Sequence, residues 1–444
     1  AGLNVWTNFR QPEQYIQNIR EAVREGQLSM QLLNQRVREV LMVKFRLGLF
    51  DQPLNKDVKT ADQIVHREEE SAFAEQLNKA SLVLLKNQDR LLPLAKDNHQ
   101  KILVTGPLAR ETGFTVSRYG PSNNTSVSVY DGLQQFAGHD ISLEYAKGCE
   151  VTNPGWPGTE IIETGLSDEE QSMIDTAVRK AKQVDVVIAV VGETEKLVGE
   201  SLSRTSLDLP GRQHQLLKAL YATGKPVILV MINGRPLTIN WENHYLPAIL
   251  EAWFPGPSAG KAIAEALFGA YNPGGKLPVT FPKTIGQIEY NFPFKPASHA
   301  DQPASGDNGY GKTRVNGALY PFGYGLSYTT FSYSDLQIRS LQRGSIACSF
   351  LLKNTGARTG GAVVQLHFKV KESSVIIYEW QLRAFERISL QPGEEKRIHL
   401  KIALTDLALL NKEMKWETEN GEFEIAIGSS SEDIRLKAPF SVGI

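Results

Sequence analysis

The chain has 444 residues and a formal net charge of -1 without a basic stripe, which argues against a nucleic-acid partner and favours no membrane surface. Its length predicts about two or three domains, and no apolar run is long enough for a transmembrane helix. Cys149 and Cys348 lie far apart and are expected to be buried free thiols. The histidines are scattered, so we expect no metal site and no cofactor.

The first part of the chain predicts two helices. Residues 12–25 and 30–47 carry apolar residues at helical spacing, and Ser29 is placed to cap the second helix. Gly48 ends that helix before the extended linker FDQPLN. Two helices alone cannot bury these apolar faces, so we expect them to pack on a further neighbour or on the domain that follows.

From about residue 68 to 282, short apolar runs alternate with amphipathic helices, which predicts a mostly parallel sheet covered by helices on both faces. The predicted strands are Ser81–Leu85, Ile102–Thr105, Ser142–Tyr145, Val184–Val191, Val227–Ile232 and Ile249–Trp253, and the predicted helices are 69–80, 167–183, 211–223 and 258–268. The turns at Gly106 and Gly234 lack phosphate-loop chemistry, which counts against a nucleotide-binding α/β protein. We expect Arg235 to form a structural ion pair.

The last part of the chain consists of two segments with different composition and pattern. Residues 286–330 are rich in Gly, Pro, Asn and Tyr and predict a long connector, which Tyr320 and Tyr324 are expected to fasten to its neighbours. From residue 331 to 444, alternating strands are separated by the turn signals NTG, QPG and NG. This spacing is typical of an all-β sandwich.

The segment DVVIAVVGETEKLVGESLSRTSLDLPG is the first place to look for chemistry. Its apolar run, Asp185–Val191, predicts a strand buried on both faces, and the loop that follows carries Glu193, Glu195 and Glu200. Ligands of open α/β sheets bind beyond the carboxyl ends of the strands. The competing interpretation is a solvated acidic loop.

Several motifs resemble one family. RVREVLMVKFRLGLF, ASLVLLKNQDRLLPL, SRTSLDLPGRQ, VILVMINGRPL, ALFGAYNPGGKLPVTFP and YPFGYGLSYTTF follow one another along the chain. Together they resemble the β-glucosidase type of glycoside hydrolase family 3. KNTGARTGGAVVQLHF, LRAFERISLQPGE and GEFEIAIGSSS look like the fibronectin type III-like domain of that family, so the resemblance covers essentially the whole chain.

The resemblance implies an enzyme in three parts: a (β/α)8 barrel with a nucleophilic aspartate, an α/β sandwich that lends the acid/base, and an accessory β-sandwich. Measured against that plan, the chain is expected to begin after the nucleophile. The expected domains are residues 1–52 (last helices of the barrel domain and linker), 53–285 (α/β sandwich), 286–330 (connector) and 331–444 (fibronectin type III-like domain). The missing barrel would act in cis or in trans, and this chain alone is expected to be inactive.

The activity implied by the resemblance is retaining, exo-acting hydrolysis of terminal β-D-glucosyl residues, with β-xylosides as the alternative substrate. A glycoside or oligosaccharide is the implied substrate, no cofactor is needed, and the intact protein is expected in the periplasm or outside the cell. The competing function is a non-catalytic half that binds carbohydrate or complements a barrel partner.

Glu200 is the first candidate for the acid/base, because in the family this glutamate sits shortly before a Ser-Arg element and GESLSRTSLDLPG fits that place. Glu193 is the alternative, directly past the strand, and Glu195 has neither advantage. Arg204 is the supporting candidate. Paired with Glu200 it would hurt acid catalysis, so we expect it to pair with Asp208 or Glu193 and pin the loop. A surface salt bridge of little value is the alternative for Arg204.

Overall fold

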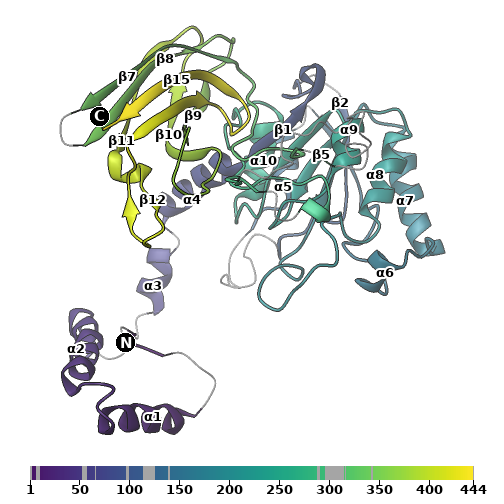
Figure 1. Ribbon diagram of the computed structural model, residues 1–444. Helices are drawn as coiled ribbons and strands as arrows, with labels where there is room; N and C mark the ends of the chain where they lie inside the picture. Colours follow the sequence, from purple (N-terminus) through teal and green to yellow (C-terminus); the bar gives the residue numbers. More distant parts are fainter. Residues whose placement is uncertain are drawn as a thin grey trace. The chain divides into compact units, whose positions relative to one another are not determined.

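The computed structural model in Figure 1 describes most of the chain. The described residues are 3–6, 11–52, 58–65, 67–96, 100–113, 126–138, 141–287, 291–295, 315, 317–341 and 344–443. The chain divides into two compact units, residues 1–71 and 72–444. Among the described residues, no helix combines the length and apolar character that a bilayer crossing requires.

The first unit consists of helices. Its elements are α1 (Pro12–Arg24), α2 (Met30–Arg46), α3 (Val58–Val65) and the first turn of α4 (Glu68–Ser81). The Ser29 side chain accepts a hydrogen bond from the backbone N–H of Leu32 at 3.1 Å, which confirms the predicted cap. Throughout α1 and α2, both fully described, no side chain is buried. The apolar stripe of α2 is therefore not part of a core.

A six-stranded sheet forms the centre of the second unit. Its strands stand in the order β1-β6-β5-β4-β2-β3, and all neighbours are parallel except β1 and β6. The predicted, mostly parallel sheet is thus confirmed. The strands are β1 (Val83–Asn87), β2 (Gln100–Thr105), β3 (Ile141–Ala146), β4 (Val186–Gly192), β5 (Val227–Ile232) and β6 (Ala248–Glu251).

Helices cover both faces of this sheet, as Figure 1 shows. Along β4, Ile188 and Val190 pack into the cluster of α5 (Val129–Ala137) and α10 (Ala259–Leu267). Val187 and Ala189 point the other way, into the cluster of α7 (Asp168–Ala181) and α8 (Gln213–Tyr221). All seven residues of β4 are buried, so the predicted two-sided burial is confirmed.

Short elements complete the α/β layer. These are α6 (Gly158–Ile161), α9 (Asn240–Tyr245) and the 3-10 turns Gln88–Arg90 and Ile285–Gln287. The sequence analysis did not predict α3, α5, α6 or α9. Helix α7 begins with a capping box in which the Ser167 side chain accepts from the Glu170 N–H and the Glu170 carboxylate accepts from the Ser167 N–H.

The connector is fastened to the α/β layer by its tyrosines, as predicted. The Tyr320 hydroxyl donates to Oδ1 of Asn243 at 2.7 Å, and the Tyr324 hydroxyl donates to the carbonyl oxygen of Leu85 at 3.1 Å. The two tyrosine rings stack with centroids 5.3 Å apart. Connector residues 288–290, 296–314 and 316 lie outside the described part of the chain.

The predicted β-sandwich follows the connector and is confirmed. One sheet has the order β10-β9-β14-β15 and the other β11-β8-β7, with a core of alternate side chains from both. The strands are β7 (Phe331–Leu341), β8 (Ser345–Asn354), β9 (Gly360–Val370), β10 (Gln381–Leu390), β11 (Glu395–Ala403), β14 (Gly421–Gly428) and β15 (Ile434–Val442). A 3-10 turn (Leu404–Leu407) and the small hairpin β12 (Leu409–Leu410) and β13 (Trp416–Glu417) lie between β11 and β14. Cys149 and Cys348 are both buried and free, as expected.

Candidate active site

The acidic loop leaves the sheet at a fixed point, the end of β4. Gly192 has a φ of 135°, and a Cβ there would lie 1.9 Å from the carbonyl oxygen of Ile232, so this exit requires glycine. The buried Gln213 side chain holds both backbone groups of Gly192: Oε1 accepts from its N–H at 2.6 Å, and Nε2 donates to its oxygen at 2.9 Å. The loop therefore starts from a rigid support.

Glu193 is enclosed by two arginines. Its side chain is 0% exposed and its backbone N–H donates to the carbonyl oxygen of Ile232 at 2.7 Å. Its Oε1 lies 2.5 Å from Nη1 of Arg204 and 3.1 Å from Nε of Arg235. A carboxylate held this way is a buried structural anion, and the predicted ion pair of Arg235 is confirmed.

Arg204 ties the far end of the loop to two other segments. Its Nη2 donates to Oε1 of Glu160, on α6, at 2.9 Å and to the carbonyl oxygen of Asp208 at 2.7 Å. Burial of Glu160 would raise the pKa of its carboxyl, but hydrogen bonds from Thr205 and Trp156 and the charge of Arg204 outweigh it and hold that pKa below its ordinary value. Glu160 is thus an anion that secures Arg204.

Glu200 lies on the exposed part of the loop, between two anchored points. Arg235 donates through Nη2 to the carbonyl oxygen of Leu197 at 2.8 Å, before Glu200, and Arg204 anchors the chain after it. Glu200 itself is exposed. The Glu195 carboxylate lies against Gly113, where a built Cβ would be 2.9 Å from its Oε2. The three glutamates of the loop thus differ in burial: Glu193 is buried, Glu195 is half-buried and Glu200 is exposed.

A second buried acid, Glu251, stands at the end of β6, which β5 separates from β4. Glu251 is 0% exposed, and burial raises the pKa of its carboxyl to about 8, with the Glu193 charge acting in the same direction. The backbone N–H of Trp253 donates to its Oε1 at 2.8 Å, and Nδ2 of Asn233 lies 3.2 Å from its Oε2. Asn233 also donates to the carbonyl oxygen of Arg235 at 2.7 Å, so Glu251 supports the turn that carries Arg235.

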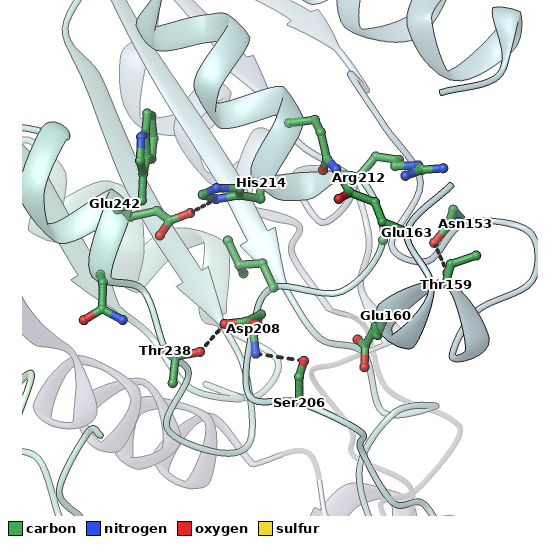
Figure 2. A pocket seen from close by; sticks show the side chains of 15 residues that line it. Asn153, Thr159, Glu160, Glu163, Ser206, Asp208, Arg212, His214, Thr238 and Glu242 are labelled. Carbon is green, nitrogen blue, oxygen red and sulfur yellow. Dashed lines mark hydrogen bonds and ion pairs between the residues drawn. The ribbon is translucent and has the colours of Figure 1, made fainter. Parts of the chain in front are cut away.

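A pocket adjoins this network on the α6, α8 and α9 side and is drawn in Figure 2. Its volume is about 420 Å³. Glu160 and Asp208, which both contact Arg204, stand in its wall. Among the described residues, no three His, Cys, Asp or Glu side chains are grouped so that they could hold a metal ion.

Three residues of this network, Glu160, Asn233 and Glu251, were not predicted from the sequence. Glu160 lies in a four-residue helix without a periodic pattern, so no signal in the sequence placed it beside Arg204. Asn233 does carry a signal, because it follows the carboxyl end of the predicted strand next to the one that leads to Glu193. Glu251 lies inside the predicted strand Ile249–Trp253, which borders the strand before Asn233 and not the strand that leads to Glu193.

Family models match both the α/β layer and the β-sandwich of this chain. The model of the glycosyl hydrolase family 3 C-terminal domain matches residues 82–328, and that of the fibronectin type III-like domain matches residues 362–431. A periplasmic beta-glucosidase of Salmonella typhimurium is 38% identical and is matched over 95% of this chain and 57% of its own length. A beta-xylosidase of Formosa agariphila is 36% identical, over 94% of this chain and 56% of its own length.

A beta-glucosidase of Listeria innocua, solved in complex with isofagomine, superposes with a TM-score of 0.81 at 30% identity. The match covers 96% of this chain and 57% of that one, so the chain spans little more than half the length of these relatives. The family match extends over more than half of the chain and includes the sheet, the acidic loop and Arg235. The chain belongs to glycosyl hydrolase family 3.

Proposed function

We propose that this chain is the C-terminal portion of a retaining exo-β-glycosidase that removes terminal β-D-glucosyl residues, with β-xylosides as the alternative substrate. Family membership supports a glycosidase, and relatives named beta-glucosidase and beta-xylosidase support these two sugars. The relative named periplasmic supports export of the intact protein to the periplasm or beyond.

In this proposal Glu200 is the acid/base. The observation that carries the assignment is the enclosure of Glu193 between Arg204 and Arg235, whereas Glu200 is exposed on the same loop. A general acid must reach the leaving oxygen of the substrate, which a fully enclosed carboxylate cannot do. Arg204 and Arg235 act as positioning residues, because they hold the loop on either side of Glu200.

The reaction proceeds in two steps that share Glu200. In the first, a nucleophilic carboxylate attacks the anomeric carbon while Glu200 protonates the leaving oxygen; in the second, Glu200 takes a proton from the water that releases the sugar. The two carboxyl groups of a retaining site stand about 5–5.5 Å apart. We propose that the nucleophile belongs to a (β/α)8 barrel outside this chain, which acts in cis or in trans.

The test of Glu200 uses the enzyme assembled with its barrel. Glu200→Gln and Glu200→Ala should lower hydrolysis of natural glycosides by about 10²–10⁴-fold, the usual contribution of a general acid/base. Aryl glycosides with good leaving groups should lose less in the first step, and azide should rescue the Ala variant by attacking the glycosyl-enzyme. Azide rescue of Glu193→Ala without rescue of Glu200→Ala would reverse the assignment.

The competing function, a half that only binds carbohydrate or complements a barrel partner, needs a different assay. The chain alone is tested on aryl β-glucoside and β-xyloside and then mixed with a separately made barrel. Activity that arises only on mixing supports a catalytic unit split between two parts. Turnover by the chain alone would place the nucleophile within these residues and contradict the proposed barrel.

A further inference from the structure

The pocket in Figure 2 has the dimensions of a ligand site. Its volume of about 420 Å³ falls within the range of roughly 300–1,000 Å³ found for small-molecule sites. Three separate segments form its walls: residues 153–163 around α6, residues 206–215 leading into α8, and residues 238–242 at the start of α9. Polar groups from distant parts of the chain are therefore brought to one place.

Hydrogen-bonding side chains converge on this space. The Thr238 hydroxyl donates to Asp208, whose backbone N–H donates to the Ser206 hydroxyl at 3.2 Å. Between the same two segments, Nδ1 of His214 lies 2.7 Å from Oε1 of Glu242, and Figure 2 shows these two side chains pointing toward each other. Carboxylates and hydroxyls oriented in this way suit a ligand that presents several hydroxyl groups.

An aromatic side chain completes the wall. Trp241 lines the pocket and is itself held by edge contacts to His214 and Tyr221, with ring centroids 5.4 and 5.6 Å apart. Tyr245 packs against it at 5.0 Å. A fixed indole offers broad apolar contact at little cost in conformational entropy, which suits the C–H face of a pyranose ring.

The negative charge of the pocket distinguishes neutral from anionic ligands among those that carry several hydroxyl groups. The basic side chain of Arg212 is already committed to Glu170 at 3.0 Å. The exposed carboxylates of Glu163 and Asp208 form no ion pair in the part of the chain that the structure describes, and Arg204 contacts Asp208 through its backbone oxygen alone. An excess of negative charge disfavours phosphorylated sugars and uronic acids but not a neutral sugar.

We propose that this pocket binds a neutral pyranose, such as a glucosyl or xylosyl unit of a glycoside. The proposal rests on the proposed function only in naming a sugar as the hydroxyl-rich ligand. The site is assembled entirely from residues 153–242 of this chain, so binding needs no barrel.

The test is direct binding to the 444-residue chain, measured by calorimetry or by saturation-transfer NMR. The probes are methyl β-D-glucopyranoside, methyl β-D-xylopyranoside and cellobiose, with glucose 6-phosphate and glucuronate as anionic counterparts. Asp208→Ala should weaken binding of the neutral probes by about tenfold or more, the effect of losing a hydrogen bond to a charged group. Trp241→Ala should do the same, and circular dichroism checks that its fold is kept.

Two control variants locate the ligand. Trp416→Ala removes an exposed tryptophan of the β-sandwich and should leave binding unchanged. Glu200→Gln should also leave binding unchanged. Loss of binding in Glu200→Gln but not in Asp208→Ala would place the sugar elsewhere and overturn the proposal. Absence of binding by the unmodified chain, or anionic sugars that bind as tightly as neutral ones, would overturn it as well.

These experiments distinguish a failure of the pocket proposal from a failure of the proposed function. An assembled enzyme that does not cleave glycosides, combined with Asp208-dependent sugar binding by the chain, would reject the proposed function and keep the pocket. Cleavage that depends on Glu200, without Asp208-dependent binding, would keep the proposed function and reject the sugar site in the pocket.

Discussion

Glu193 and Glu200 share one loop, but the first is buried and the second is exposed. Glu193 has no exposed surface, and the Arg204 side chain that faces it is 2% exposed. Removing one partner of a buried pair leaves an uncompensated charge, which costs more than the pair itself contributes. The two glutamates should therefore respond to mutation in different ways.

Glu193→Ala should lower the free energy of unfolding by about 3–5 kcal/mol, because it leaves Arg204 and Arg235 without their common anion. Glu200→Ala is the matched control on the exposed part of the loop and should change stability by less than about 0.5 kcal/mol. Urea unfolding of the two variants measures this difference in the free energy of unfolding. Equal stability of both would contradict the structural role of Glu193.

Glu251 gives a pH-dependent prediction. Its pKa is raised from 4.5 to about 8, so the folded state binds a proton that the unfolded state releases between these values. The contribution of Glu251 is then complete at low pH and falls by roughly 1.4 kcal/mol per pH unit as the pH rises through this window. Glu251→Gln mimics the protonated acid and should lack the fall. The measurement compares urea unfolding of the variant and the unmodified chain across this pH window, and parallel curves would refute the prediction.

The sequence predicted the loop and its glutamates, and the family motif put Glu200 ahead of Glu193, but no local pattern showed that Glu193 would be enclosed. The distinction depends on Arg235, which arrives from the end of a neighbouring strand, and on Glu160, which arrives from α6. Both contacts join residues that are far apart in the sequence, so no periodic pattern in the sequence predicts them. Arg204 lies close enough in sequence for its partners to be anticipated as Asp208 or Glu193, and it contacts both, Asp208 through the backbone oxygen.

At the scale of elements, two helices on one face of the sheet touch through glycines. A Cβ built on Gly132 of α5 would lie 2.1 Å from the backbone of Gly260 in α10. A Cβ on Gly260 would lie 2.0 Å from the carbonyl oxygen of Ser128. The same glycine explains why α5 was not predicted: Gly132 lowers the helix propensity of a short segment, and only the partner helix shows its purpose.

Gly260→Ala should therefore destabilise the chain by about 1–3 kcal/mol, the usual cost of overpacking, because the neighbouring atoms are backbone and α5 must move. Gly158→Ala is the control, since nothing lies within 4 Å of a Cβ at that glycine. Thermal unfolding of both variants tests the contact. A Gly260→Ala variant as stable as the unmodified chain would show that the helices separate freely.

The fold was more predictable than the site. The six strands of the sheet were predicted to within a few residues because β-branched runs such as VVIAVV and VILVMI have no other stable place than a doubly covered sheet. The antiparallel pairing of β1 with β6 was not predicted, since strand direction depends on tertiary contacts and not on hydrophobic pattern.

At the scale of the whole molecule, the α/β layer and the β-sandwich belong to one compact unit. The buried Gln365 of β9 joins them, donating through Nε2 to the carbonyl oxygens of Gly323 at 3.2 Å and Ser429 at 2.9 Å. Asn272 adds a bond to the carbonyl oxygen of Thr359 at 2.9 Å. These contacts couple the connector and the sandwich to the sheet that carries the acidic loop.

We expect residues 72–444 to unfold in a single calorimetric transition. Gln365→Ala should lower its stability by roughly 1–3 kcal/mol, because the buried carbonyl oxygen of Gly323 and the half-buried one of Ser429 lose their donor. Gln337→Ala on β7 is the matched control and should change stability by less than about 0.5 kcal/mol, because its amide donates to Asp335 and accepts from Arg339, two exposed residues. Separate transitions for sheet and sandwich in the unmodified chain would contradict this coupling.

The anchors on either side of Glu200 also bear on protein engineering. Leu197 is held through its carbonyl oxygen and Arg204 through its guanidinium, while residues 199, 200, 201 and 203 between them are exposed. We expect that this short stretch can be exchanged for segments of other length or sequence while the hydrogen bond at Leu197 and the ion pair of Arg204 hold its ends. The distance that the carboxylate of Glu200 reaches from the sheet then becomes adjustable on an unchanged scaffold.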